Sequence, residues 1–170
     1  MDDAEFTQWA IGCQRQLVRT AYLMSGDLQR AEDLVQDALT KVALRWHKLR
    51  HTNPDAYVRT ILVRDNISWW RRHRRESVVD ALRDPAVQPA GHPAGHPADT
   101  ETSLVVRASL ARLTEKQRAV VVLRHFEDRS ERETAEILGI SVGTVKSQNS
   151  AALARLREGA PELLDLIGRT

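Results

Sequence analysis

The chain has 170 residues, with 25 Lys and Arg against 23 Asp and Glu, so its formal net charge is only +2. Its 42% of hydrophobic residues are typical of a globular protein, and a single cysteine excludes an intramolecular disulfide. No apolar run approaches the roughly 18 residues of a membrane span, and the acidic start resembles no signal peptide. We therefore expect a cytoplasmic protein with no membrane insertion, whose partners are indicated by charge clustering.

The first part of the chain predicts two amphipathic helices. Residues 5–24 place apolar side chains near the 3.6-residue period, and Cys13 among them is expected to be a packed thiol. Residues 25–27 break this helix, and Asp27 can cap the next one, which covers residues 28–46 and has a more regular apolar face. The opposite face begins with acidic residues and ends with basic ones. One interpretation is a solvated face whose charges suit the helix dipole, and the other is a docking surface for a partner. Both interpretations stay open on this pattern. The residues at the acidic end of that face are Glu32, Asp33, Gln36 and Asp37.

Positive charge gathers in the next segment. Residues 47–54 form a basic loop, and the helix expected over about 55–75 carries five arginines against one acid from Arg64 onward. Arginines contact phosphates and indoles stack on unpaired bases, so this mixture suits single-stranded or melted DNA. The alternative is an exposed basic helix end with at least one tryptophan in the core. The side chains concerned are Lys48, Arg50, His51, Arg64, Trp69, Trp70, Arg71, Arg72, Arg74 and Arg75.

The composition changes at residues 76–102. Four of the six prolines lie between Pro85 and Pro97, and Pro-Ala-Gly-His occurs twice in succession. Such a segment has no means of building a core, so we expect a flexible linker. His92 and His96 are four apart, but the proline between them prevents a helix that would place them on one side. No metal site is expected there.

Helical periodicity returns near Leu104, and the pattern then predicts a helix-turn-helix. Thr114 with Gln117 forms a capping box for a helix over 115–127, and Ser130 with Glu133 forms another. Gly139 suits the left-handed residue that ends the latter helix, after which Ser141 caps a second one. Its outer face has small polar and basic side chains, as a helix in a DNA major groove requires. The residues on or flanking that face are Thr144, Lys146, Ser147, Gln148, Ser150, Ala151 and Arg155.

These patterns predict an all-α chain of two small helical domains joined by a flexible linker. The expected divisions are a first domain over 1–75, the linker over 76–102, a second domain over 103–158 and a tail over 159–170. No Walker loop, zinc cluster, nucleophile elbow or HExxH motif is present. Asp33 and Asp37 resemble a metal-binding pair, but no third ligand converges on them in the sequence, so a structural use is expected. We therefore expect no enzymatic activity, no metal and no cofactor.

Several motifs, in this order, resemble a bacterial RNA polymerase sigma factor of the extracytoplasmic-function group, and in particular its actinobacterial SigE-like subgroup. Ser25-Gly-Asp27 followed by Ala31-Glu-Asp-Leu-Val-Gln-Asp-Ala38 looks like the signature of sigma domain 2. Leu113-Thr-Glu-Lys-Gln-Arg-Ala-Val120 and Gly139-Ile-Ser-Val-Gly-Thr-Val-Lys-Ser147 look like two motifs of domain 4. The resemblance covers nearly the whole chain apart from the linker and tail.

The resemblance implies a division of work between the two domains. Glu32, Asp33, Gln36 and Asp37 would dock on the β′ clamp helices of core RNA polymerase, and domain 4 would sit on the β flap. Recognition of the −10 promoter element would fall to Lys48, Arg50, His51, Arg64, Trp69, Trp70, Arg71, Arg72, Arg74 and Arg75. Recognition of the −35 element would fall to Thr144, Lys146, Ser147, Gln148, Ser150, Arg124 and Arg132. An anti-sigma factor is a further expected partner.

Some positions depart from the group's pattern. Arg64 stands where an asparagine is common, Gln148 replaces a usual arginine, and Asn149 lies at a position that is often apolar. Two other functions would leave signals of their own in the sequence. A stand-alone helix-turn-helix regulator predicts a receiver or ligand pocket in residues 1–75, and a nucleic-acid enzyme predicts a metal or nucleophile cluster. The sequence shows neither feature.

Overall fold

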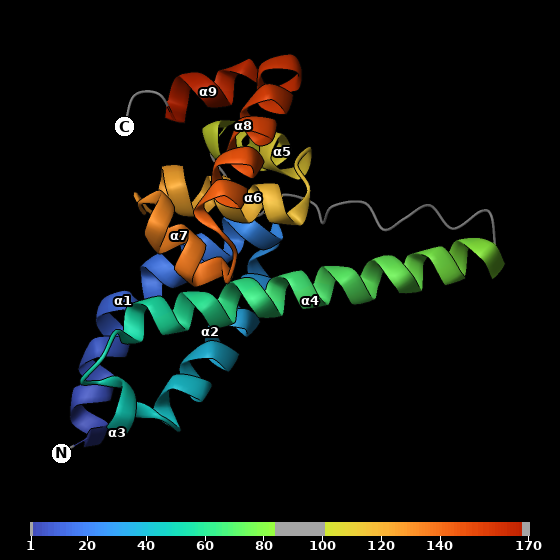
Figure 1. Ribbon diagram of the computed structural model, residues 1–170. Helices are drawn as coiled ribbons and strands as arrows, with labels where there is room; N and C mark the ends of the chain where they lie inside the picture. Colours follow the sequence, from blue (N-terminus) through green and yellow to red (C-terminus); the bar gives the residue numbers. More distant parts are fainter. Residues whose placement is uncertain (1, 84–100, 168–170) are drawn as a thin grey trace.

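The computed structural model describes residues 2–83 and 101–167, and for residues 2, 74–83, 101, 102 and 166 it describes the backbone alone. Every regular element in these residues is a helix (Figure 1). The elements are α1 (Asp2–Ser25), α2 (Leu28–Ala43), α3 (Trp46–Leu49), α4 (Pro54–Arg83), α5 (Glu101–Ala111), α6 (Glu115–Val121), η1 (Val122–Phe126), α7 (Glu131–Leu138), α8 (Val142–Gly159) and α9 (Pro161–Ile167). We call α1–α4 the N-terminal module and α5–α9 the C-terminal module.

The N-terminal module is built around the apolar faces of α1, α2 and α4. Asp27 caps α2 by accepting a hydrogen bond from the backbone of Arg30, as the sequence predicts. The predicted apolar stripe of α2 is buried, with Leu34 and Val42 at 2% and 0% exposure. Leu17 of α1 and Leu62 of α4 complete this core. Near the start of the chain the rings of Phe6, Trp9 and Trp46 pack together.

The C-terminal module contains the predicted helix-turn-helix. Thr114 and Ser130 each form the predicted capping box, and Ser141 caps α8. Gly139 ends α7 with φ of 65°, in the left-handed region that favours glycine. Val145 anchors α8 in the core, whereas Val142, which the sequence places inward, is 38% exposed.

Three helix limits differ from the sequence expectation. The predicted helix over 28–46 breaks after Ala43, so Trp46 begins the separate short helix α3. The helix expected to end near 75 continues to Arg83, so residues 76–83 of the expected linker are helical. The helix over 115–127 ends in a π-helical turn, η1, in which Glu127 donates its backbone N–H to Val122.

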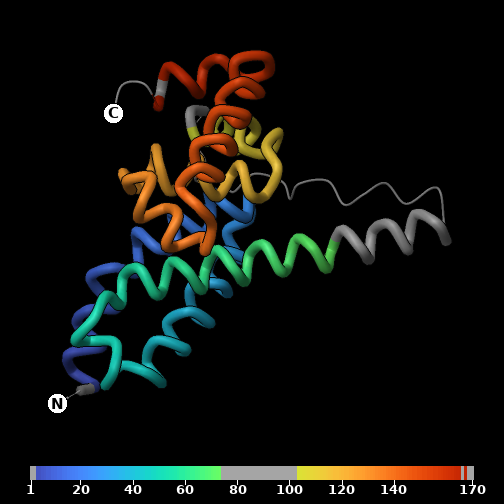
Figure 2. The backbone as a smooth tube through the Cα atoms, in the orientation of Figure 1, coloured from blue at the N-terminus to red at the C-terminus, as the bar shows by residue number. Residues whose placement is uncertain are grey.

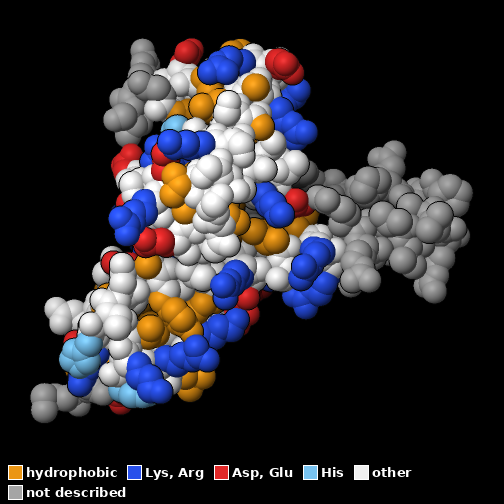
Figure 3. Space-filling model, in the orientation of Figure 1, with side chains coloured by type: hydrophobic (Ala, Val, Ile, Leu, Met, Phe, Trp, Pro, Cys, Tyr) orange, Lys and Arg blue, Asp and Glu red, His pale blue; other side chains and the backbone are white. Residues whose placement is uncertain are grey.

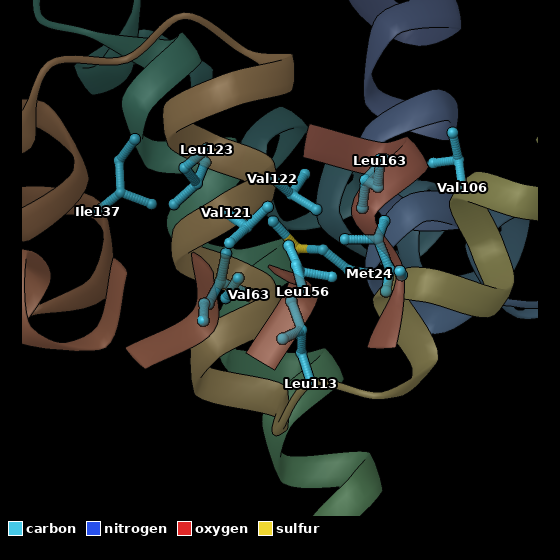
Figure 4. Close-up of a cluster of buried hydrophobic side chains, with 14 residues drawn as sticks. Met24, Val63, Val106, Leu113, Val121, Val122, Leu123, Ile137, Leu156 and Leu163 are labelled. Atoms are coloured by element: carbon cyan, nitrogen blue, oxygen red, sulfur yellow. The ribbon is translucent and has the colours of Figure 1, made fainter. Parts of the chain in front are cut away.

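The two modules pack against each other. In Figures 1 and 2, α4 passes along the side of the C-terminal module, and α7 lies directly against it. Met24 of α1 and Val63 of α4 belong to the same buried cluster as Leu113, Leu123 and Leu156 of the C-terminal module (Figure 4). One apolar core therefore crosses from one module to the other, although the linker expected over 76–102 lies outside the described residues for 84–100.

The tail beyond residue 158 packs back onto the C-terminal module. Leu163 of α9 has no exposed surface and joins the shared core, and Ala160 before it is 5% exposed. Because α9 contacts both α5 and α8, it closes the end of this module.

Candidate nucleic-acid interface

The acidic residues predicted to dock a partner form one exposed face of α2. Glu32, Asp33, Gln36 and Asp37 are all exposed, because the opposite stripe of the helix supplies the core. Asp33 accepts a long hydrogen bond of 3.4 Å from Gln29 in the preceding turn. The four side chains thus form a continuous polar face that a partner can reach.

The short helix α3 and the loop after it present the first part of the predicted −10 surface. Lys48 and His51 are exposed. Arg50 is half-buried and lies between two neighbours, 3.3 Å from a carboxylate oxygen of Glu5 and 3.0 Å from Nε2 of His51. The contact with Glu5 holds this loop against the start of α1.

The basic side of α4 continues that surface. Arg64, Arg71 and Arg72 are exposed, whereas the side chains of Arg74 and Arg75 lie outside the described residues. Figure 3 shows Lys and Arg side chains distributed over this face of the molecule, along the N-terminal module. Exposed guanidinium groups on a straight helix can contact successive phosphates of one strand.

The two tryptophans of α4 are half-buried and already contact other rings. Trp69 stacks on His73 with ring centroids 3.8 Å apart, and the guanidinium of Arg30 lies 4.9 Å from its ring centroid. Trp70 packs edge-on against Trp69, with Arg118 of α6 5.8 Å from its ring. Burial lowers the pKa of Arg30, while Asp33 opposes this shift. In this conformation both indole rings contact the protein, so stacking on a base requires them to exchange these contacts.

The predicted recognition residues of α8 follow its N-terminal cap. Thr144, Lys146, Ser147 and Ser150 are exposed, and Gln148 is half-buried. Ser147 donates to the carbonyl oxygen of Thr144, and Lys146 forms an exposed ion pair with Glu131 at 3.6 Å. A side chain that is exposed and weakly paired can change partners when DNA approaches.

The two residues outside α8 that are predicted to contact the DNA backbone differ in exposure. Arg132 on α7 is 86% exposed and forms an i,i+4 pair with Glu136 at 3.3 Å. Arg124 in η1 is half-buried and donates to the carbonyl oxygen of Arg129. Arg132 is therefore accessible to phosphate, whereas Arg124 also holds the loop before α7.

Asn149, for which the sequence offered no role, has a partner in η1. Its side-chain oxygen lies 3.0 Å from Nε2 of His125. This contact ties the recognition helix to the preceding helix and explains a polar residue at an inward-leaning position. The signal in the sequence was a polar residue on the inner face, but its partner is 24 residues away.

The two predicted DNA surfaces adjoin in this structure. Arg71 of α4 and Gln148 of α8 line one cavity of about 560 Å³, together with residues at the start of α6. Within residues 2–83 and 101–167, no cluster of His, Cys, Asp or Glu could hold a metal ion. In the same residues no helix is long and apolar enough to cross a membrane.

Comparisons with known proteins agree over both modules. Residues 12–76 match the family model for Sigma-70 region 2, and residues 103–156 match that for Sigma-70, region 4. The RNA polymerase sigma-E factor of Streptomyces coelicolor is 36% identical over 156 residues, covering 91% of this chain and 85% of the relative. That of Streptomyces avermitilis is 38% identical over 160 residues, covering 91% and 84%.

A solved structure with a similar fold is the co-crystal structure of the sigma factor RpoE with the anti-sigma factor NepR from Bartonella quintana. The TM-score is 0.71 at 29% sequence identity, covering 91% of this chain and 95% of that chain. The similarity therefore extends over both modules together.

Proposed function

Because this chain belongs to the extracytoplasmic-function group of the sigma-70 family, we propose that its exposed surfaces divide the recognition of polymerase and promoter between the two modules. The chain is an RNA polymerase sigma factor that directs promoter-specific transcription initiation. Its partners are core RNA polymerase and promoter DNA. The observation that supports this assignment of surfaces is that the acidic face on α2 is separate from the basic and polar surfaces on α3, α4 and α8.

The acidic face of α2 is the proposed docking site for core polymerase. Its members Glu32, Asp33, Gln36 and Asp37 are exposed, and the core of the module depends on none of them. Carboxylates repel DNA phosphates, so this face is directed toward protein. The β′ clamp helices are the proposed partner, and the β flap is the proposed partner of the C-terminal module.

The −10 element is proposed to bind along α3 and α4. Lys48, His51 and Arg64 are exposed and free of any buried ion pair, so they can reach the strand without disturbing the fold. Arg71 and Arg72 extend the same basic surface. Trp69 and Trp70 join it only after their present ring contacts rearrange.

The −35 element is proposed to bind α8. Thr144, Ser147 and Ser150 offer short hydroxyl groups to base edges, while Lys146 reaches phosphate. Since the helix has few basic groups, attachment to polymerase has to supply part of its affinity. A stand-alone regulator, which needs a self-sufficient DNA-binding helix, is not favoured by the relatives of this chain.

Three further proposals concern the setting in which the chain acts. It contributes binding rather than catalysis to initiation, and it works in the cytoplasm with the polymerase. An anti-sigma factor is its proposed regulator, because a structurally similar sigma factor was crystallised with one.

The test is transcription in vitro from a library of genomic promoters. Purified chain added to core polymerase is expected to start RNA synthesis at defined positions on a subset of templates that core alone does not use. Identical transcripts with and without the chain, on every template, would overturn the assignment of surfaces together with the function.

A further inference from the structure

One carboxylate of the C-terminal module is buried among donors of the N-terminal module. Glu127 follows η1, and its side chain is 3% exposed. Arg59 of α4 donates through Nε to Oε2 at 2.9 Å, and Gln16 of α1 donates to the same oxygen at 3.2 Å. The hydroxyl of Thr20 donates to the other oxygen, Oε1. We call Gln16, Thr20, Arg59 and Glu127 the ionic latch.

The latch differs from the surface ion pairs of the chain. The Arg59 side chain is also only 3% exposed, whereas Arg132 and Glu136 within α7 are 86% and 66% exposed. A buried carboxylate is tolerated only when several donors replace its water. Here the side-chain donors Gln16, Thr20 and Arg59 all come from the other module, so the carboxylate has these protein partners only while the modules are together.

A second polar contact crosses the same boundary. Arg118 of α6 is 5% exposed, and it donates to Met24 O at the end of α1 at 3.1 Å. It also donates to Leu110 O at 2.9 Å, so one guanidinium ties the end of α1 to α5. Burial lowers the pKa of Arg118, and the nearby charge of Glu115 opposes this shift.

The packing of the two modules prevents one chain from contacting both promoter elements at the same time. The −35 and −10 elements lie about 25 base pairs apart by their names, which is roughly 85 Å of B-form DNA. In the structure Arg71 of the −10 surface and Gln148 of the −35 helix line one cavity of about 560 Å³. The modules therefore have to separate before one chain contacts both elements.

We propose that the ionic latch holds the free sigma factor in a closed, inactive conformation, and that opening it is a step of polymerase and promoter binding. The latch is part of the chain itself, so closure needs no regulatory partner. Opening exposes Arg59 and Glu127 to water, which solvates both charges, and it uncovers Met24 and Val63 of the shared core. The inference rests on the proposed use of the two modules at two promoter elements.

The experiment measures the distance between the modules in the free chain. Nitroxide labels are placed at exposed positions on α1 and α8, through Gln8→Cys and Glu158→Cys in a Cys13→Ala background, and distances are read by pulsed electron resonance. The native chain is expected to give one predominant distance, that of the closed conformation. Glu127→Gln, which keeps the shape but removes the charge, is expected to raise the population at long distances roughly tenfold or more.

Two further variants make the result specific. Glu136→Gln removes the same charge from an ion pair within α7 and is expected to give the native distances. Thr20→Val removes one donor to Glu127 without changing the side-chain shape, so it is expected to shift the populations in the same direction by a smaller factor. If Glu127→Gln fails to fold by circular dichroism, Thr20→Val decides the question.

A native chain that is mainly open would overturn the proposal, as would folded Glu127→Gln and Thr20→Val chains with native distances. The measurement contains neither polymerase nor DNA. A negative result here therefore leaves promoter-specific transcription intact, whereas failure of the transcription assay does not change the distance between modules.

Discussion

At the scale of single residues, Gly139 and Gly143 in the helix-turn-helix have different backbone requirements. Gly139 has φ of 65°, whereas Gly143 lies in the first turn of α8, where an added Cβ would meet only Ser141 Oγ at 3.8 Å. We expect Gly139→Ala to lower the free energy of unfolding by about 1 kcal/mol, because a Cβ is strained in the left-handed region. Urea unfolding measures the difference.

The matched control is Gly143→Ala in the same motif. Alanine fits this helical position, so the substitution should leave stability unchanged or raise it by up to about 1 kcal/mol. Equal destabilisation by both substitutions would show that the conformation at Gly139 is not what the turn requires.

Charge reversal at Asp37 tests the docking face at the same scale. Asp37 is exposed and contributes nothing to the core, so Asp37→Arg should leave the helical content intact. We expect pull-down of core polymerase to fall at least tenfold, since a like charge then faces the partner. Asp3→Arg, an equally exposed site on α1, is the control and should retain native binding. Native recovery of core with Asp37→Arg would refute the assignment.

At the scale of elements, α8 is expected to hold DNA through few cationic groups. Lys146 is exposed near the helix start, and Arg157 is exposed in its last turn. In the polymerase-bound state, Lys146→Ala should weaken promoter binding several-fold and reduce the salt dependence of log K by about 1. Binding isotherms at several salt concentrations measure both quantities. Arg157→Ala should match the native chain, and an unchanged salt slope for Lys146→Ala would remove Lys146 from the interface.

The local patterns of the sequence were sufficient to predict most elements. Apolar periodicity predicted α2, and the capping residues Asp27, Ser130 and Ser141 predicted where α2, α7 and α8 begin. The exposed face of α2 and the polar face of α8 followed from the same periodicity. These signals are readable because each depends on residues three or four positions apart.

Contacts between distant residues could not be predicted in the same way. Arg59 and Glu127 are 68 positions apart, and neither residue stands out by its neighbours. His125 and Asn149 meet only because η1 packs against α8, and Trp69 is stacked on His73 beneath Arg30 of another helix. The sequence therefore predicted the two domains but not whether they pack together, and the structure shows a core shared between them.

At the scale of the whole molecule, closure has a consequence for polymerase binding. If polymerase binds only the open form, its apparent dissociation constant is the intrinsic value divided by the open fraction. Glu127→Gln should then strengthen binding to core by the factor by which it raises the open population. Fluorescence anisotropy titration of labelled chain with core measures this, with Glu136→Gln as the control. A weaker or unchanged affinity for Glu127→Gln would contradict the coupling.

The most direct measurement of the whole account is the distance between the labelled modules before and after assembly with core polymerase and promoter DNA. In the free chain we expect the distance of the closed conformation, and in the transcribing complex a longer one, matching modules bound at the −10 and −35 elements. A complex that initiates transcription while the distance of the closed conformation persists would contradict this expectation.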